Sequence, residues 1–258
     1  MVVSGETLYH IGLRRSEGAA YCLLTGDPGR VETVAQYLED PRFVAQNREY
    51  VTWEGRLEEE RVLVVSHGIG GPSTAICVEE LVQCGAQVLI RIGTCGGMHL
   101  EVRGGDLVVA SAAIRMEGLS REYLPVEFPA VADFEVTAAL AQAGKSAGIP
   151  CHVGVVQCKD SFYGQHDPDS MPIAEQLKGR WAAWLKGGCL ASEMESAALF
   201  IVSAVRGVRA GCVLQAIWNQ ERVQAGLPDT RCPSPEAAAR TAVQALAALI
   251  RQDREKKK

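Results

Sequence analysis

The sequence has no long apolar segment and no excess of positive charge. Its longest apolar run falls well short of the ~18 consecutive residues that a membrane-spanning helix needs. No charged segment followed by an apolar segment and a small-residue cleavage site opens the chain, so we expect neither a signal peptide nor a membrane partner. Lys and Arg total 26 against 31 Asp and Glu, and the resulting net charge of −5 argues against nucleic acid as a partner.

The nine cysteines lack the spacing of a metal or redox site. No two of them are arranged as C-x-x-C, and the five histidines show no metal-ligand spacing. Several cysteines, such as Cys22, Cys77 and Cys212, lie in apolar runs, where a free thiol behaves as a small buried hydrophobe. We therefore expect a cytoplasmic protein with reduced cysteines.

The common catalytic templates are missing as well. There is no H-E-x-x-H, no G-x-S-x-G and no Walker A loop, because Gly144-Lys145 lacks the earlier glycine. Gly68-x-Gly70 resembles the start of a dinucleotide fingerprint, but Ser73 stands where the third glycine is needed. These glycines still indicate tight backbone turns or the close approach of a ligand.

The sequence does contain a regular alternation of strand-like and helical patterns. Runs such as VLVV and VLIRI are almost continuously apolar, which is typical of strands buried on both faces. The alternation predicts a single α/β domain with a mixed sheet over residues 1–258, whose basic end, 253–258, is expected to fray. We expect strands at residues 20–24, 62–66, 88–92, 106–112, 152–156 and 211–218, and helices at 28–38, 73–84, 134–147, 174–185, 194–205 and 234–252.

Two segments predict the binding of a small anion. In TGDPGR, Asp27 is a helix N-cap and Arg30 falls in the first turn, where an anion bound near the helix amides would offset its unfavourable interaction with the helix dipole. An ordinary turn with a surface arginine is the alternative.

Arg91 lies within an apolar strand and needs a partner, and residues 94–97 are expected to form a turn beside it. Phosphate is one candidate partner, and a structural Arg–Glu pair is the other.

Two carboxylates mark the start of a later helical pattern. Glu193 and Glu195 flank Met194 before an apolar run, where negative charge suits the N-terminus of a helix. A carboxylate that grips vicinal hydroxyls, such as those of a ribose, is the alternative. Residues 160–172 are rich in Gly, Pro and Asp and are expected to form a loop with substrate contacts.

Together these segments resemble the family of hexameric nucleoside phosphorylases, and most closely its uridine-cleaving branch. The matching stretches span almost the whole chain: GDPGR, NREY, GIGGPSTAICVEEL, RIGTCGG, EFPAVADFE, SFYGQ and EMESA. The resemblance implies one α/β domain around a mixed, partly barrel-like sheet flanked by helices, and a homohexamer built as a trimer of dimers with shared sites. It also implies a pentosyltransferase of nucleotide salvage that reversibly cleaves uridine with phosphate to uracil and α-D-ribose 1-phosphate. Phosphate is then a co-substrate, and no cofactor is required.

The resemblance also implies roles for individual residues. Arg48 and His10 would cross a dimer interface into the partner subunit's site. The phosphate site would comprise Gly26, Arg30, Arg48, Arg91 and Thr94. The ribose site would comprise His10, Thr94, Met194 and Glu195, and the base site Phe162, Gln165, His166, Ile217 and Arg222. Catalysis would rest on Arg30, Arg91 and Glu195, and a structural potassium ion would bind at Glu49, Ile69 and Ser73.

The chain departs from this family at the base site. Asp167 and Gln220 stand where the better-known bacterial uridine phosphorylases carry arginines, so His166 and Arg222 are the candidate replacements. Asn219 stands where the hexameric purine branch uses an aspartate to protonate the base, and an asparagine cannot deliver that proton, which favours a pyrimidine substrate. A purine nucleoside phosphorylase and a non-catalytic nucleoside-binding protein remain the alternatives.

Overall fold

The computed structural model describes residues 6–256, which form a mixed sheet flanked by helices. The strands are β1 (Tyr21–Thr25), β2 (Glu39–Asn47), β3 (Tyr50–Leu57), β4 (Glu60–Ser66), β5 (Val88–Gly97), β6 (Leu107–Arg115), β7 (Ala130–Val131), β8 (Cys151–Cys158), β9 (Ala191–Glu193) and β10 (Arg209–Asn219). The helices are α1 (Val31–Ala35), α2 (Gly71–Gln83), α3 (Ser120–Tyr123), α4 (Phe134–Ser146), α5 (Phe162–His166), α6 (Ala174–Lys186), α7 (Ser196–Arg206), α8 (Gln220–Gln224) and α9 (Glu236–Lys256).

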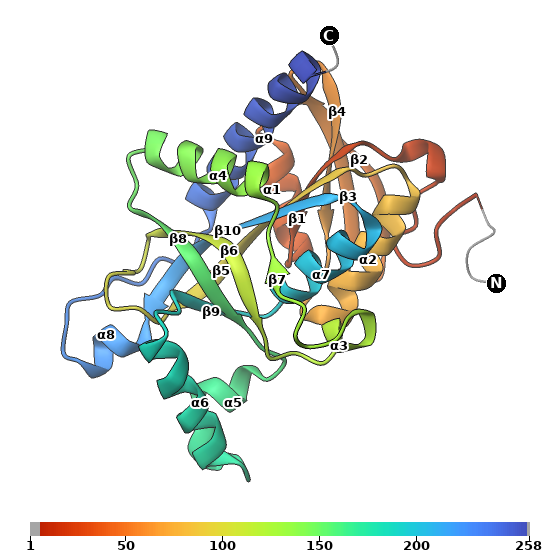
Figure 1. The fold of residues 1–258 in the computed structure, drawn as a ribbon. Coiled ribbons are helices and arrows are strands. Elements are labelled where there is room, and N and C mark those ends of the chain that lie inside the picture. The colour runs from red at the N-terminus through yellow and green to blue at the C-terminus, as the bar shows by residue number, and fades with distance from the viewer. Residues whose placement is uncertain (1–5, 257–258) are drawn as a thin grey trace.

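The sheet closes on itself at one end. Its strand order is β10-β6-β8-β9-β5-β1-β4-β3-β2, with β7 beside β6. Because β10 also pairs with β5, the strands β10, β6, β8, β9 and β5 form a ring, from which β1, β4, β3 and β2 extend (Figure 1). Pairing is parallel between β1, β4, β5 and β10 and antiparallel in the β2–β3–β4 meander. The prediction of a mixed, partly barrel-like α/β sheet is therefore confirmed.

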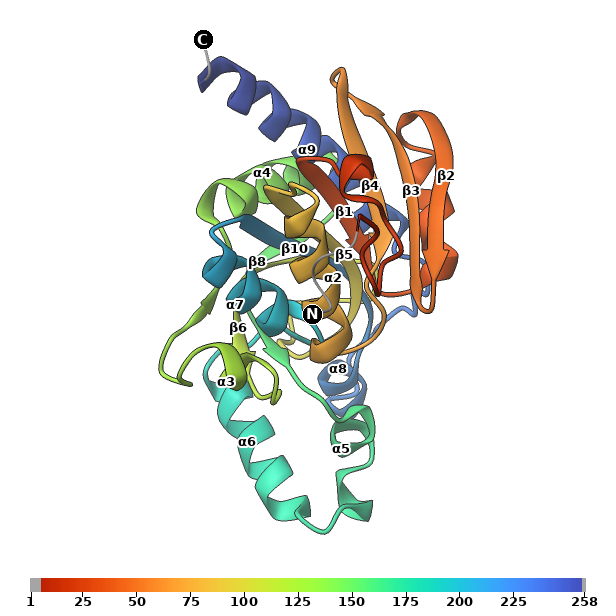
Figure 2. The same ribbon diagram turned by 90° about the vertical axis from the view of Figure 1, so that its right-hand side faces the viewer.

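Apolar side chains cover both faces of this sheet. On β1, Cys22 and Leu24 pack into a cluster with α2 and α7, whereas Tyr21 and Leu23 pack into a second cluster with α1, α4 and α9. In both views α4 and α9 lie side by side at one end of the molecule, and α5 and α6 project at the other (Figures 1 and 2). Burial on both faces explains why the strand sequences are nearly continuous apolar runs.

The structure differs from the expected elements at several points. The expected helix 28–38 is a 3₁₀ turn, Pro28–Arg30, followed by α1, which ends at Ala35. Residues 94–97 continue β5 instead of turning, because they pair with both β10 and β9. The expected loop 160–172 contains the short helix α5. The strands β2 and β3 were not predicted. For β2 the reason is that it is an edge strand whose side chains are partly or fully exposed. None of the helices within residues 6–256 combines the length and apolar character that crossing a bilayer requires.

The C-terminal helix extends beyond its predicted end at residue 252. Residues 253–256 belong to α9, 257–258 lie outside the described residues, and the expected fraying of 253–258 stays a prediction. Asp253 accepts a hydrogen bond from the Tyr21 hydroxyl at 3.1 Å and forms an ion pair with Arg209, so the helix end is tied to β1 and β10. Burial opposes ionisation of Asp253, but hydrogen bonds from Arg209 and Tyr21 hold its pKa below the ordinary value.

Asp253→Asn is therefore expected to lower the free energy of unfolding by about 1 kcal/mol at neutral pH, because the ion pair with Arg209 is lost. A carboxyl whose pKa is lowered by folding stabilises the fold above its unfolded pKa, so the difference from wild type should shrink as the pH falls through the folded pKa, below 3.8. Urea denaturation at a series of pH values measures both effects. Glu255→Gln, at an exposed position of the same helix, is the matched control; an equal change in both variants would contradict the anchoring role of Asp253.

Candidate active site

A cavity of about 900 Å³ opens where the parallel strands end. Its walls come from residues at or just after the carboxyl ends of β1, β4, β5, β8 and β10, the position at which α/β sheets usually bind ligands. The predicted site residues that line it are Gly26, Arg30, Glu49, Ile69, Ser73, Arg91, Thr94, Phe162, Gln165, His166, Met194, Glu195 and Ile217. The fold thus brings together most of the candidates that the sequence had placed far apart.

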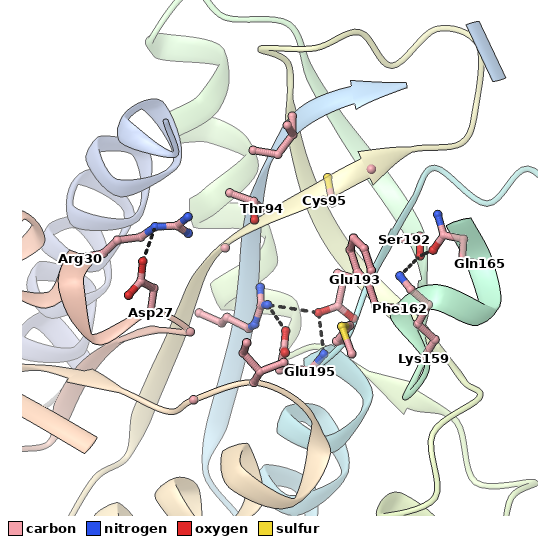
Figure 3. Close-up of a pocket in the computed structure, with 18 of the residues that line it drawn as sticks. Asp27, Arg30, Thr94, Cys95, Lys159, Phe162, Gln165, Ser192, Glu193 and Glu195 are labelled. Atoms are coloured by element: carbon pink, nitrogen blue, oxygen red, sulfur yellow. Dashed lines mark hydrogen bonds and ion pairs between the residues drawn. The ribbon is translucent and has the colours of Figure 1, made fainter. Parts of the chain in front are cut away.

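One end of the cavity offers groups suited to an anion. Asp27 caps the 3₁₀ turn by accepting a hydrogen bond from the Gly29 amide at 2.9 Å, and its carboxylate lies 3.6 Å from Nε of Arg30. The Arg30 side chain is one-third exposed and, with Thr94, lies on the opposite side of the cavity from Gln165 (Figure 3). Arg30 can therefore exchange its weak contact with Asp27 for a stronger anionic ligand.

Arg91 lies on the floor of the cavity, paired with two carboxylates. It is buried in β5, and its Nη2 contacts Glu195 and lies 3.5 Å from Glu193. Gly93 makes this position possible, because a Cβ there would come within 1.9 Å of Arg91 Nη1. Nε of Arg91 is buried without a hydrogen-bond partner in the described structure. The structural Arg–Glu pair considered from the sequence is thus present, and it forms part of the cavity wall.

The two glutamates that flank Met194 have different tasks. Glu193 ends β9 and accepts hydrogen bonds from the amides of Glu195 and Ser196 at 2.8 and 3.0 Å, so it caps α7. Glu195 points instead toward Arg91 and accepts a hydrogen bond from the Gly70 amide at 2.7 Å. Burial raises the pKa of Glu193, whereas Arg91 holds the pKa of Glu195 below its ordinary value despite burial. Glu195 is therefore the ionised carboxylate that the cavity presents.

The opposite end of the cavity is formed by α5 and β10. Phe162, Gln165 and His166 come from α5, and Ile217 and Trp218 come from β10. The His166 ring lies 4.3 Å from the Phe162 ring and is stacked at 6.5 Å on Trp218. Burial lowers the pKa of His166, so this ring is neutral at physiological pH. This end therefore combines aromatic faces with an amide group.

Three further polar side chains at this end were missed by sequence reasoning. Lys159 follows β8 directly, and its Nζ donates a hydrogen bond to Ser192 Oγ at 2.6 Å. Ser192 Oγ lies 2.6 Å from Gln165 Oε1, so the three side chains form one connected group (Figure 3). A lysine shortly after a predicted strand is a weaker form of the signal that had singled out Arg91, which lies within its strand. Arg231, whose guanidinium lies 5.3 Å from the Trp218 ring centre, follows α8 in a segment with no comparable signal.

Arg222 is not placed in the cavity, contrary to the expectation for the base site. Its Nε and Nη2 donate to the Pro228 carbonyl at 3.0 and 2.7 Å, and Nη1 donates to the Leu100 carbonyl. Asn219 causes this placement because its Oδ1 accepts the amides of Glu221 and Arg222 and so starts α8. Arg222 therefore braces the loop after α8 and does not line the cavity.

His10 and Arg48 also lie outside the cavity lining of their own chain. Nδ1 of His10 is 2.6 Å from Glu80 Oε1, and Arg48 lies over the Tyr9 ring at 5.6 Å. Asn47 joins the two segments by donating hydrogen bonds to the carbonyls of Tyr9 and His10. Their expected roles in a partner subunit's site stay predictions.

The three expected potassium ligands lie together at the edge of the cavity. Ser73 Oγ donates a hydrogen bond to Glu49 Oε1 at 2.8 Å, and Ile69 precedes α2 with an exposed side chain. The Glu49 backbone amide and Ser73 hold the pKa of Glu49 below its ordinary value. Carboxylate, hydroxyl and carbonyl oxygens are suitable donors for a hard cation. Among residues 6–256, no group of three or more His, Cys, Asp and Glu side chains could hold a metal ion.

Comparison with known proteins agrees with this geometry. The family model described as Phosphorylase superfamily matches residues 20–252. The uridine phosphorylase of Treponema pallidum is 53% identical over 253 residues, which cover 98% of each chain, and the uridine phosphorylase of Escherichia coli is 40% identical over 96% of this chain and 100% of its own. A guanosine phosphorylase of Halorubrum lacusprofundi is 33% identical over 93% of this chain and 98% of its own. The chain belongs to the phosphorylase superfamily.

The protonation of His67 tests how far water is excluded from the floor of the cavity. Its ring is fully buried; Nδ1 lies 3.1 Å from Thr74 Oγ1, and Nε2 has no partner in the described structure. Burial, together with the charge of Arg91, lowers the pKa of His67 to about 4.

The His67 ring is therefore expected to stay neutral as the pH is lowered through 6.5. In the unfolded chain it takes up a proton near the ordinary pKa, so His67 lowers the stability of the fold progressively as the pH falls from 6.5 toward about 4. Titration of histidine ring signals by NMR, with His67→Gln to assign the resonance, measures this pKa. An inflection of the His67 signal near 6.5 would contradict the buried, uncompensated environment.

Proposed function

We propose that the chain is a uridine phosphorylase, which reversibly converts uridine and phosphate to uracil and α-D-ribose 1-phosphate. The observation that carries the proposal is the order of groups along the cavity: Arg30 and Thr94 at one end, Glu195 beside Arg91 in the middle, and Phe162 with Gln165 at the other end. Phosphate, ribose and base would occupy these positions in turn. The names of the relatives from Treponema pallidum and Escherichia coli support the same activity.

The chemistry follows from charge placement. A phosphate oxygen attacks the anomeric carbon while the bond between this carbon and N1 of the base breaks, and positive charge develops on the ribose. Arg30 and Arg91 would hold the anionic nucleophile below the sugar, and ionised Glu195 would accept hydrogen bonds from the ribose hydroxyls. The reaction inverts the anomeric centre, needs no covalent enzyme intermediate and uses no cofactor besides phosphate as co-substrate.

The base end favours a pyrimidine. The amide of Gln165 offers one donor and one acceptor, which complement the N3–H group and an adjacent carbonyl of uracil. Asn219 cannot act as a proton donor to a purine, because it is fully buried and its amide is used by the carbonyls of His99 and Val102. This disfavours the purine alternative represented by the Halorubrum relative.

The same proposal extends to assembly and location. A cytoplasmic homohexamer with shared sites, acting in nucleotide salvage, would give His10 and Arg48 a task in the partner subunit's cavity, since neither lines its own. A structural potassium ion would take oxygen ligands from Glu49, Ile69 and Ser73. Measurement of the particle mass in solution tests the homohexamer. Repeating it with and without potassium tests whether the ion supports the assembly.

The first assay measures release of free base from uridine and from inosine, each with and without phosphate. Uracil should appear only when both uridine and phosphate are present, because water cannot make use of the two arginines. Release of hypoxanthine from inosine instead would move the protein to the purine branch. Binding of uridine without release of any base would identify a nucleoside-binding protein.

Glu195→Gln is expected to lower kcat/KM for uridine by about 100-fold, because a charge-assisted hydrogen bond to the ribose 2′-hydroxyl is weakened at the reacting sugar. The loss should be at least several-fold smaller for 2′-deoxyuridine, which lacks this hydroxyl. The two substrates serve as mutual controls for any general effect on the fold or on Arg91. Equal losses on both would contradict a contact between Glu195 and the 2′-hydroxyl.

A further inference from the structure

The proposed reaction leaves negative charge on the departing base, and this inference rests on that proposed function. When the glycosidic bond breaks, its electron pair passes to N1 of uracil and spreads over the two carbonyl oxygens. Asp167 and Gln220, at the two positions that the family resemblance singles out, carry no positive charge. Stabilisation of the departing charge by a direct contact with a cation therefore requires another basic side chain at the base end.

Three of the basic side chains near the base end do not meet this requirement. Arg222 is turned away and donates to the carbonyls of Pro228 and Leu100. His166 is neutral because burial lowers its pKa. Arg231 also lines the cavity, but its side chain is exposed to water, which screens its charge.

Lys159 is placed differently from these three. Only 4% of its surface is exposed, and it lines the cavity beside Gln165 and His166. Its Nζ donates a hydrogen bond to Ser192 Oγ at 2.6 Å, and within residues 6–256 the carboxylates of Glu193 and Glu195 act on it through their charges without forming an ion pair. Glu193, the carboxylate whose charge acts most strongly on Lys159, already accepts the hydrogen bonds that cap α7. An ammonium group has three donors, so Lys159 retains two beyond the bond to Ser192.

A buried cation without an anionic partner is unfavourable in the free protein. Burial accordingly lowers the pKa of Lys159 below its ordinary value, although Glu193 opposes this effect. An anion formed in the cavity would relieve the penalty. The transition state, in which the base becomes negative, is therefore stabilised more than the neutral bound nucleoside.

We infer that Lys159 is a catalytic residue that stabilises the negative charge on the departing uracil, held in position by Ser192. The phosphate oxygen forms a bond to C1′ as the bond from C1′ to N1 breaks, and the electron pair leaves with the base. Lys159 donates hydrogen bonds to the base anion and keeps its proton. The uracil anion takes up a proton from water after the step, so charge and atoms balance.

Lys159→Met tests this assignment, because methionine fills a similar volume without charge. For uridine, kcat/KM should fall by about 100-fold, as when one donor to a developing anion is removed. For 5-fluorouridine, whose base leaves as a less basic anion, the fall should be at least several-fold smaller. Lys145→Met, at an exposed position on α4, is the matched control and should leave both rates unchanged.

The comparison of the two nucleosides separates chemistry from structure. If Lys159 only supports the fold of the site, both rates fall by the same factor, and that result would overturn the inference, as would an unchanged rate on uridine. Uracil release by the wild type is measured first. A wild type that releases no uracil removes the proposed function itself, whereas an active wild type with equal losses in Lys159→Met removes only the role of Lys159.

A second measurement needs no variant. Barbiturate resembles uracil but is an anion at neutral pH, so the wild type should bind it at least 10-fold more tightly than uracil in calorimetry. Equal affinity for the two would overturn the inference even if Lys159→Met failed to fold. Where the variant does fold, it should lose this preference for the anion.

Discussion

The buried ion pair between Arg91 and Glu195 is the interaction on which the cavity depends. Removing the charge of Arg91 would leave Glu195 buried without a cationic partner, which costs about 3–5 kcal/mol. The surroundings are adapted to the pair: Gly93 leaves space for the guanidinium, the Gly70 amide donates to Glu195, and His67 stays neutral below it. The pair thus keeps two opposite charges in fixed positions in the wall of the cavity.

The closed ring of strands explains how the groups of the cavity reach one another. Arg91 lies on β5, Glu195 follows β9, Lys159 follows β8, and Trp218 ends β10. In an open sheet these strand ends would be spread along an edge, but the pairing of β10 with β5 brings them around one opening. The ends of β1 and β4 then add Gly26, Arg30 and Gly68 on the side of the anion.

One end of the cavity is organised by contacts between side chains from different strands and helices. There Lys159, Ser192 and Gln165 form one connected group. Arg222, which the sequence had placed at this end, stabilises the loop after α8 because Asn219 starts that helix. Proximity along the chain was therefore a poor guide to which basic side chains line the cavity.

By itself the sequence determined the α/β class, the buried strands and the need of Arg91 for a charged partner. Continuous apolar runs identify strands covered on both faces, and a charged residue inside such a run, as at Arg91, must find a partner. Only the tertiary structure decided which residues share the base end, because that depends on ring closure and on helix starts such as the Asn219 cap. It also decided that residues 94–97 continue β5 and that α9 holds its end through Asp253, since both rest on contacts with strands distant in sequence. Local patterns report burial and turns, whereas the direction of a side chain is set by partners that only the folded chain brings near.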